Sequence, residues 1–440
     1  MTERVYMHVG APKSGTTYLQ KVLDTNRQTL ADAGVLVVGE SRVDLVHAGM
    51  AVREDPRLDT LPETARQAWS RLVAEIRAWP GHTAVLSYEL LGGASTEQVR
   101  RALADLAGLE VHVVVSARDF AKAVPSAWQE KLKFAFTQPL EQWVPRPEED
   151  GPRAEWGWRT MDPAGVAARW GADLPAERVH IVTAPRGDAA RDELWRRFAA
   201  ACSLDVPGLR TDVPRANESL GVVAAELLRR VNERVGAPIS SSREQATWIR
   251  DTLAHGVLTR LGKEPIGLTE AQHADARERS AAAIATLAAS GYDIVGDLED
   301  LRAGDVDGRT PSQVTEPELL DAATRTIVEL LLMVREAATV PTPGPVHEVA
   351  EAEPQRGVRG RVGRAGKGVA RAATSGALFL ENRRLQARLD ALESQVQATR
   401  MLQLRVAELG DVVTELLLPA AQRDQEATAA AIAKYRKDSL

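Results

Sequence analysis

The sequence predicts an α/β fold: a mostly parallel sheet flanked by helices, with helical additions and a C-terminal coiled coil. Short apolar runs alternate with helical apolar spacing through the first half of the 440-residue chain. After Asn217 the spacing is helical only, and near the C-terminus leucine and valine recur at heptad spacing. Strands that alternate with helices are joined by crossover connections, which make the strands parallel and place helices on both faces of the sheet.

Each element follows from a local pattern. Strands are expected at 5–9, 34–39, 83–93, 109–117 and 178–184, the third of them running into a loop. Helices are expected at 17–30, 63–79, 95–107, from about 119, and at 192–202. The run Val113–Val115 has no polar alternation, which is typical of a strand buried on both faces. The helical segments "ESLGVVAAELLRRVNERV", "EQATWIRDTLAHGVLTRL" and "EAQHADARERSAAAIATLAASG" are expected to pack on the sheet and cover the site, and 316–338 adds another helix.

The composition changes after residue 338. Residues 339–354 are Pro-rich, acidic and aperiodic, and 355–373 combine arginine and glycine without an acidic side chain. We therefore predict one α/β domain at 1–338 and a Pro/Gly/Arg-rich linker at 339–375. A solvated linker is the favoured interpretation of the basic part, and peripheral contact with a membrane surface or with nucleic acid is the alternative.

A heptad seam follows the linker. Its members are Leu385, Leu389, Leu392 and Val396, and then Leu402, Val406, Leu409, Val413 and Leu416. The three-residue shift near Thr399 is a stammer in an otherwise regular coiled coil. The sequence thus predicts a coiled-coil helix at 376–418 that makes the chain a homo-oligomer, followed by a charged helical or flexible tail at 419–440.

Overall composition excludes several classes of protein. The formal net charge of -6 gives no reason to expect nucleic acid as a partner. Cys202 is the single cysteine, so an intrachain disulfide cannot form, and the sequence offers no ligand spacing for structural zinc. Because the N-terminus has no basic and apolar leader and no run approaches a membrane span, a cytoplasmic protein is expected.

The stretch "VYMHVGAPKSGTTYLQKVL" carries a glycine loop between the first strand and the first helix. Gly10 and Gly15 have Walker spacing, but Thr16-Thr17 replace the Lys-Ser/Thr that should follow, and Lys13 lies ahead of the second glycine. Backbone N–H groups at such a helix start bind anions. Without a lysine after Gly15, the loop fits one phosphate plus one further charged group better than a triphosphate with Mg²⁺.

"PKSGTTYLQ" resembles the 5′-phosphosulfate loop of sulfotransferases that use 3′-phosphoadenosine 5′-phosphosulfate (PAPS), which have a P-loop-type fold. The resemblance implies that Lys13 contacts the sulfuryl-bearing bridge. It implies that the 5′-phosphate is held by Ser14, Gly15, Thr16 and Thr17. A second family element, which binds the 3′-phosphate, is matched in "VVVSARDFAKAVPSAWQEKLK" by Arg118 and Ser126. An arginine at the carboxyl end of a parallel strand also lies where open α/β sheets bind ligands. The resemblance covers about residues 4–135, with weaker similarity to about 300.

Sulfuryl transfer needs a base for the acceptor's proton. His47 follows the second strand and Glu89 follows the third, and the family uses either residue type. We favour His47 as the base, with Glu89 as an orienting residue or the alternative base. His8 is interpreted as structural. Lys13 would neutralise charge on the bridging oxygen, and PAPS is expected as co-substrate without a metal.

Tryptophan is more frequent than phenylalanine in this chain, nine against five, and several tryptophans follow the Arg118 strand. These are Trp128, Trp143, Trp156 and Trp158. Packing is the favoured role for most of them, while aromatic contacts with a glycan, glycolipid or natural-product acceptor are the alternative. The Pro- and Gly-rich stretch at 138–163 is a candidate acceptor lid.

Two other functions compete with a PAPS-dependent sulfotransferase. A P-loop nucleotide kinase or NTPase would need a lysine after Gly15 and an aspartate at a strand end for Mg²⁺, and neither is found at the matching positions. A non-catalytic sulfotransferase-like scaffold, oligomerised by its coiled coil, is the third reading. The presence of Lys13, Arg118 and Ser126 argues against it.

Overall fold

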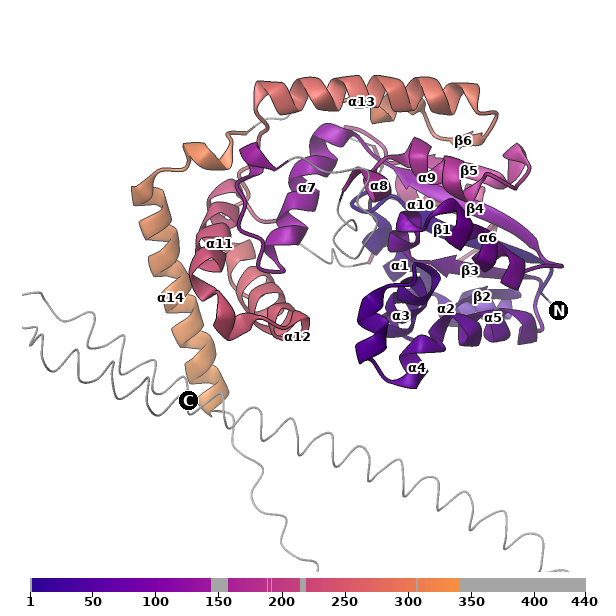
Figure 1. The fold of residues 1–440 in the computed structure, drawn as a ribbon, viewed down its shortest axis with the longest axis horizontal. Coiled ribbons are helices and arrows are strands. Elements are labelled where there is room, and N and C mark those ends of the chain that lie inside the picture. Colours follow the sequence, from indigo (N-terminus) through magenta and orange to yellow (C-terminus); the bar gives the residue numbers. More distant parts are fainter. Residues whose placement is uncertain are drawn as a thin grey trace, which may run out of the picture. The chain divides into compact units, whose positions relative to one another are not determined.

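The computed structural model describes residues 2–143, 157–187, 189–190, 192–213, 219–305 and 308–339. At its centre is a six-stranded parallel sheet in the order β2-β3-β1-β4-β5-β6 (Figure 1). The strands are β1 (Arg4–Gly10), β2 (Val35–Val37), β3 (Thr83–Ser87), β4 (Glu110–Ala117), β5 (Val179–Thr183) and β6 (Asp293–Val295). The predicted α/β class with a mostly parallel sheet is confirmed.

Helices cover both faces of this sheet, and the further helices after residue 219 pack mainly on other helices and not, as expected, on the strands. In chain order the helices are α1 (Thr16–Thr25), α2 (Arg27–Asp32), α3 (Arg42–Val52), α4 (Glu63–Arg66), α5 (Ala68–Ala78), α6 (Thr96–Asp105), α7 (Phe120–Leu132), α8 (Trp158–Met161), α9 (Pro163–Trp170), α10 (Glu193–Ala201), α11 (Val222–Val235), α12 (Ser242–Glu244), α13 (Glu270–Ala289) and α14 (Glu316–Thr339). A π-helix, η7 (Gln245–His255), follows α12 directly. The chain divides into two units, Met1–Thr326 and Ile327–Leu440, and α14 contains residues of both.

The alternation of side chains along β1 builds two cores. Val5, Met7 and Val9 join the larger core, to which α5, α6, α7, α9 and α11 contribute. Tyr6 joins the smaller core, which includes Leu19 and other residues of α1, α2 and α10. Successive strand side chains point to opposite faces, so each face of a parallel sheet needs its own helical layer.

Local structure differs from the sequence-based expectation in several places. The helix expected at 63–79 is divided at Gln67 into α4 and α5. The helix expected at 17–30 is broken at Asn26, because the buried Asn26 side chain donates to the carbonyl oxygens of Val22 and Arg210 instead of pointing to solvent.

The strand expected at 83–93 ends at Ser87, and a 3₁₀-helix, η2 (Glu89–Gly93), follows. Helix α3 and the three-residue edge strand β6 were not expected, because both have weak apolar periodicity.

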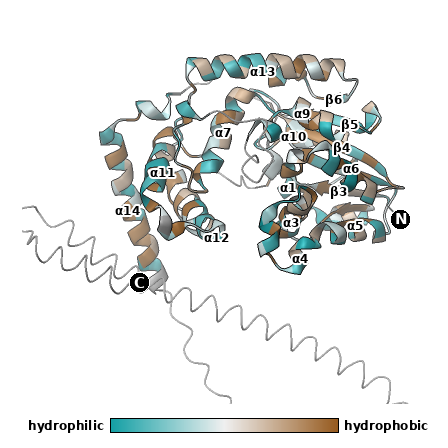
Figure 2. Cartoon of the chain, viewed as in Figure 1, coloured by the Kyte–Doolittle hydropathy of each residue, from teal (hydrophilic) through white to brown (hydrophobic). Residues whose placement is uncertain are grey.

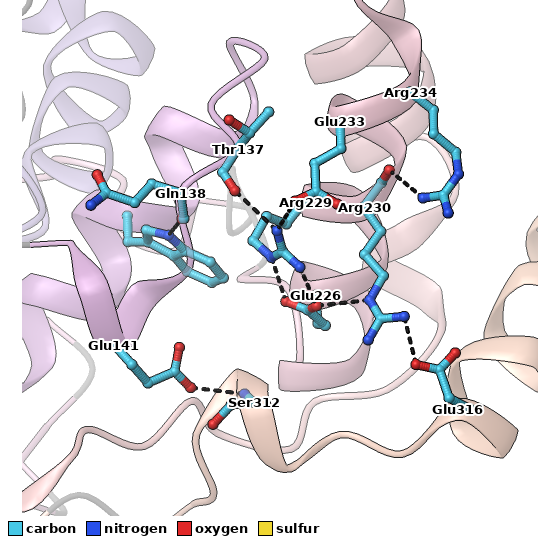
Figure 3. Close-up of polar contacts among 11 residues, drawn as sticks. Thr137, Gln138, Glu141, Glu226, Arg229, Arg230, Glu233, Arg234, Ser312 and Glu316 are labelled. Carbon is cyan, nitrogen blue, oxygen red and sulfur yellow. Dashed lines mark hydrogen bonds and ion pairs between the residues drawn. The ribbon is translucent and has the colours of Figure 1, made fainter.

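The helices after residue 219 support α7, which carries part of the candidate site. Asn232 on α11 donates to the carbonyl oxygen of Leu132 at 2.8 Å, at the C-terminal end of α7. Figure 3 shows Arg229 bound to Glu226 at 2.7 Å and to the carbonyl oxygen of Thr137 at 3.0 Å. Helix α11 combines hydrophilic and hydrophobic residues (Figure 2), as expected for a helix that packs on one side only.

The linker, coiled-coil and tail assignments concern residues that lie almost wholly outside the described ranges, and they stay predictions. Only the start of the predicted linker is described, since α14 extends to Thr339.

Candidate functional site

The glycine loop joins β1 to α1 at the carboxyl edge of the sheet. Gly15 has a φ of 93°, and a Cβ there would lie 2.4 Å from Cδ2 of Leu194. Glycine is therefore required for its backbone conformation and for space. Lys13 has a φ of 67°, a left-handed conformation that is uncommon for a non-glycine residue. No side chain caps the start of α1, so its first N–H groups are available to an anion.

A series of hydrogen-bonded polar side chains connects the glycine loop to the strands of the sheet. The Ser116 hydroxyl donates to the carbonyl oxygen of Gly10 at 2.7 Å and lies 2.6 Å from Ser14 Oγ. His8 joins Ser116 at 3.0 Å through Nε2 and Ser87 at 2.7 Å through Nδ1. Because a carbonyl oxygen only accepts, Ser116 gives its proton to Gly10 and accepts from His8, which makes His8 the Nε2–H tautomer. The loop is thereby fixed to three neighbouring strands.

His8 is fully buried within this chain of hydrogen bonds. Burial lowers the pKa of His8 from 6.5 to about 4, although the Glu89 carboxylate and a backbone hydrogen bond partly offset this effect. The imidazole is therefore neutral at physiological pH. Its position and charge state support the structural role expected from the sequence.

Arg118 follows β4 and reaches the loop. Its Nη1 donates to the carbonyl oxygen of Lys13 at 2.9 Å. Burial lowers the pKa of Arg118. Within the described residues its guanidinium forms no ion pair, because the neighbouring Asp119 carboxylate caps α7 and pairs with Arg186. A half-buried guanidinium without a carboxylate is suited to bind an anion. Ser126 lies on α7, half-buried, and its hydroxyl has no partner in the described part of the chain.

Lys13 is held by a carboxylate on α7. Its Nζ donates to Oε1 of Glu130 at 2.8 Å, and Nζ of Lys133 donates to the same oxygen at 2.7 Å. Burial alone would raise the pKa of Glu130, but the two ammonium groups outweigh it and lower the pKa to about 2. Glu130 is therefore ionised at neutral pH and bridges two cations.

Glu89, the first residue of η2, is only 5% exposed. Its Oε2 accepts from Nε2 of Gln20 on α1 at 2.7 Å, and its Oε1 accepts from Arg42 at 3.3 Å. Arg42 also donates to Gln20 at 2.5 Å. These bonds fix the orientation of the carboxylate at the end of β3, beside the loop helix.

His47 lies on α3 and is half-buried. Helix α3 packs against the start of η2, since a Cβ on Gly49 would lie 2.2 Å from the Tyr88 ring. Within the described ranges His47 forms no hydrogen bond, so nothing orients its ring. The structure thus places His47 and Glu89 on neighbouring elements, but only Glu89 is hydrogen-bonded to α1.

Three of the four clustered tryptophans are core residues. Trp128, Trp143 and Trp158 are each less than a tenth exposed. Nε1 of Trp128 donates to the carbonyl oxygen of Gln138, and the Trp158 ring contacts Phe120 edge-on. These contacts favour packing, while Trp156 and half of the candidate lid, residues 144–156, lie outside the described residues.

Sequence reasoning missed four residues of this site: Gln20, Arg42, Glu130 and Lys133. A partial signal existed for two of them. Glu130 is four residues after Ser126 on α7, and Lys133 is three residues after Glu130, spacings that place side chains on one helix face. No sequence signal indicates that this face meets Lys13.

No group of three or more His, Cys, Asp and Glu side chains in the described residues could hold a metal ion. No described helix has the length and apolar character needed to cross a bilayer.

One family model and two solved structures are similar to parts of this chain. Residues 385–439 match the model of a domain of unknown function, DUF6752. A sulfotransferase from Alicyclobacillus acidocaldarius is similar in structure, with 14% identity and a TM-score of 0.34 over 57% of this chain and 96% of that one. The sulfotransferase domain from the curacin biosynthetic pathway has 13% identity and a TM-score of 0.28 over 49% of this chain and 79% of that one. No curated protein matches the sequence.

Proposed function

We propose that this chain is a sulfotransferase that moves the sulfuryl group of PAPS to a hydroxyl or amine acceptor. The observation that carries the proposal is the pair of cationic groups at the loop: Lys13 in a left-handed conformation, and Arg118, which forms no ion pair within the described residues and donates to the Lys13 carbonyl oxygen. The N–H groups at the start of α1 and the Arg118 guanidinium could each bind one phosphate of PAPS, and the Lys13 ammonium could face its sulfuryl group. A glycan, glycolipid or hydroxylated natural product is the proposed acceptor class.

In the proposed reaction the acceptor oxygen or nitrogen attacks sulfur in line. The bond from sulfur to the bridging oxygen breaks, and 3′,5′-ADP leaves with that oxygen's charge. Lys13 would neutralise this charge, while the α1 N–H groups and the Ser14, Thr16 and Thr17 hydroxyls would hold the 5′-phosphate. Arg118 and Ser126 would hold the 3′-phosphate. The acceptor's proton would pass to His47 or Glu89, of which Glu89 is the one already oriented by hydrogen bonds.

Nucleotide binding tests the proposal. We expect 3′,5′-ADP to raise the melting temperature, because saturation at a hundredfold excess over Kd adds about 2.7 kcal/mol to the free energy of unfolding. ATP with Mg²⁺ should have a smaller effect. Stabilisation by ATP with Mg²⁺ alone would instead indicate a kinase or NTPase.

Arg118→Ala should weaken 3′,5′-ADP binding about 10–100-fold, because charge-assisted hydrogen bonds contribute about 1.5–3 kcal/mol. The affinity for 5′-AMP, which lacks the 3′-phosphate, should change much less. Isothermal titration calorimetry with both nucleotides measures the difference. Arg100→Ala, on an exposed ion pair with Asp173, is the matched control. Equal losses for both nucleotides would contradict the assignment of Arg118 to the 3′-phosphate.

The C-terminal segment is proposed to oligomerise the chain. Deleting 376–440 should lower the molar mass measured by light scattering to that of a smaller assembly, because the heptad seam is removed. The affinity for 3′,5′-ADP should stay unchanged. A truncated chain that keeps its assembly state, or that loses nucleotide binding, would show that the predicted boundary is wrong.

A further inference from the structure

Glu130 is shared by two lysines that reach it from different places. Lys13 comes from the loop after β1, whereas Lys133 lies at the C-terminal end of α7, three residues after Glu130. The side chains of Lys13, Glu130 and Lys133 are 21%, 14% and 3% exposed. Lys133 is therefore the most deeply buried of the three, and burying an ammonium group is costly unless a carboxylate accompanies it.

The charges around this group leave one positive charge in excess. Glu130 neutralises one of its two lysines. Arg250 on η7 faces the same region but binds Asp251 through two hydrogen bonds, at 2.8 and 2.9 Å. His255, also on η7, is half-buried, and burial followed by the nearby Lys133 lowers its pKa, so it adds no charge at neutral pH.

The bridging carboxylate has two opposite effects on Lys13. A lysine side chain has four rotatable bonds, and a carboxylate on a packed helix restricts where its ammonium can lie. The same carboxylate would cancel the charge that Lys13 offers to an anion. Lys133 restores that charge without needing to contact the ligand.

We propose that Glu130 is the positioning residue that holds the Lys13 ammonium at the transferred sulfuryl group, and that Lys133 compensates its charge. This inference rests on the proposed function. Glu130 affects the rate of sulfuryl transfer, because it holds Lys13 in place. Lys133 affects nucleotide affinity, because it sets the net charge of the group. Substitution of Glu130 should therefore change mainly the rate, and substitution of Lys133 should change mainly the affinity for 3′,5′-ADP.

Glu130→Gln removes the carboxylate but keeps a hydrogen-bonding side chain of the same size. The net charge rises by one, so 3′,5′-ADP should bind as tightly as to the wild type or more tightly. Sulfuryl transfer should slow about tenfold or more, because Lys13 is no longer held in place. Lys133→Met lowers the net charge by one, so 3′,5′-ADP binding should weaken about five- to tenfold, with a smaller effect on the rate.

The rate can be measured without a known acceptor, as the slow transfer from PAPS to water. Water attacks sulfur, the bond from sulfur to the bridging oxygen breaks, and 3′,5′-ADP, sulfate and the two protons of the water are released. Calorimetry with 3′,5′-ADP gives the affinity. Exposed Glu97→Gln and Lys122→Met are the matched controls, and both should behave as the wild type.

Two double variants distinguish the proposed roles of Glu130 and Lys133 from a general disturbance of the site. Glu130→Gln/Lys133→Met has the wild-type net charge and no unpaired buried lysine, so it should regain wild-type affinity while its rate stays low. In a Lys13→Met background, Glu130→Gln should cause no further loss of rate, because a positioning residue acts only through its target. Additive losses there, or equal losses of rate and affinity in Glu130→Gln, would overturn the inference. A wild-type chain that does not bind 3′,5′-ADP would overturn the proposed function as well.

Discussion

Replacing Lys13 with methionine should slow sulfuryl transfer from PAPS by about 10²–10³-fold, the usual cost of removing one preorganised group that stabilises transition-state charge. The 3′,5′-ADP affinity should fall by less than about tenfold, because most nucleotide contacts would come from the α1 N–H groups and Arg118. The bridging oxygen gains its charge only as the bond to sulfur breaks. An ammonium beside it therefore stabilises the transition state more than the bound substrate.

Single-turnover measurement of 3′,5′-ADP release, together with calorimetry, separates the two effects. Lys122→Met on the exposed side of α7 serves as the control, and it should leave rate and affinity unchanged. If Lys13→Met lost affinity as strongly as rate, Lys13 would be a phosphate ligand and not the residue that neutralises the leaving group. A variant with the wild-type rate would remove Lys13 from the reaction altogether.

The backbone of the site could be predicted from local sequence. The apolar run that ends at Gly10 predicts a strand, the glycines predict a tight loop, and the spacing after Thr16 predicts a helix; the structure has β1, the loop and α1 there. The alternation of strands and helices likewise predicts a parallel sheet. Local patterns suffice because hydrogen bonding within a helix and apolar burial along a strand depend on nearby residues.

The side-chain partners could not be predicted in the same way. Glu130 is 117 positions from Lys13, and Gln20 is 69 positions from Glu89. Such pairs form only when packed helices bring their ends to one edge of the sheet. Helix packing depends on the fit of whole surfaces, so a single sequence does not encode these contacts in any local spacing. Arg118 and Ser126 were found by resemblance to a family, and their contacts with the nucleotide stay predictions.

The free energy of unfolding should fall by about 2 kcal/mol between about pH 7.5 and about pH 5 because of His8 alone. Burial lowers the pKa of His8 from 6.5 to about 4, so below pH 6.5 the unfolded chain binds a proton that the folded chain does not. The stability associated with neutral His8 is thus complete above pH 6.5 and is lost progressively down to about pH 4. Each pH unit in this range costs about 1.4 kcal/mol.

Urea denaturation of the wild type and of His8→Gln at both pH values tests this expectation. Glutamine cannot titrate, so its stability difference from the wild type should shrink by about 2 kcal/mol as the pH falls. His112 and His255, whose pKa values burial also lowers, titrate in both proteins and cancel in the comparison. Glu130 does not interfere, because its pKa of about 2 confines its effect to lower pH. A constant difference would mean that His8 has the same pKa in the folded and the unfolded chain, and that it is therefore protonated in the folded chain at pH 5. At that pH Ser87 would have to accept from Nδ1, and the charged imidazole would add its charge to those of Lys13 and Arg118 near the loop.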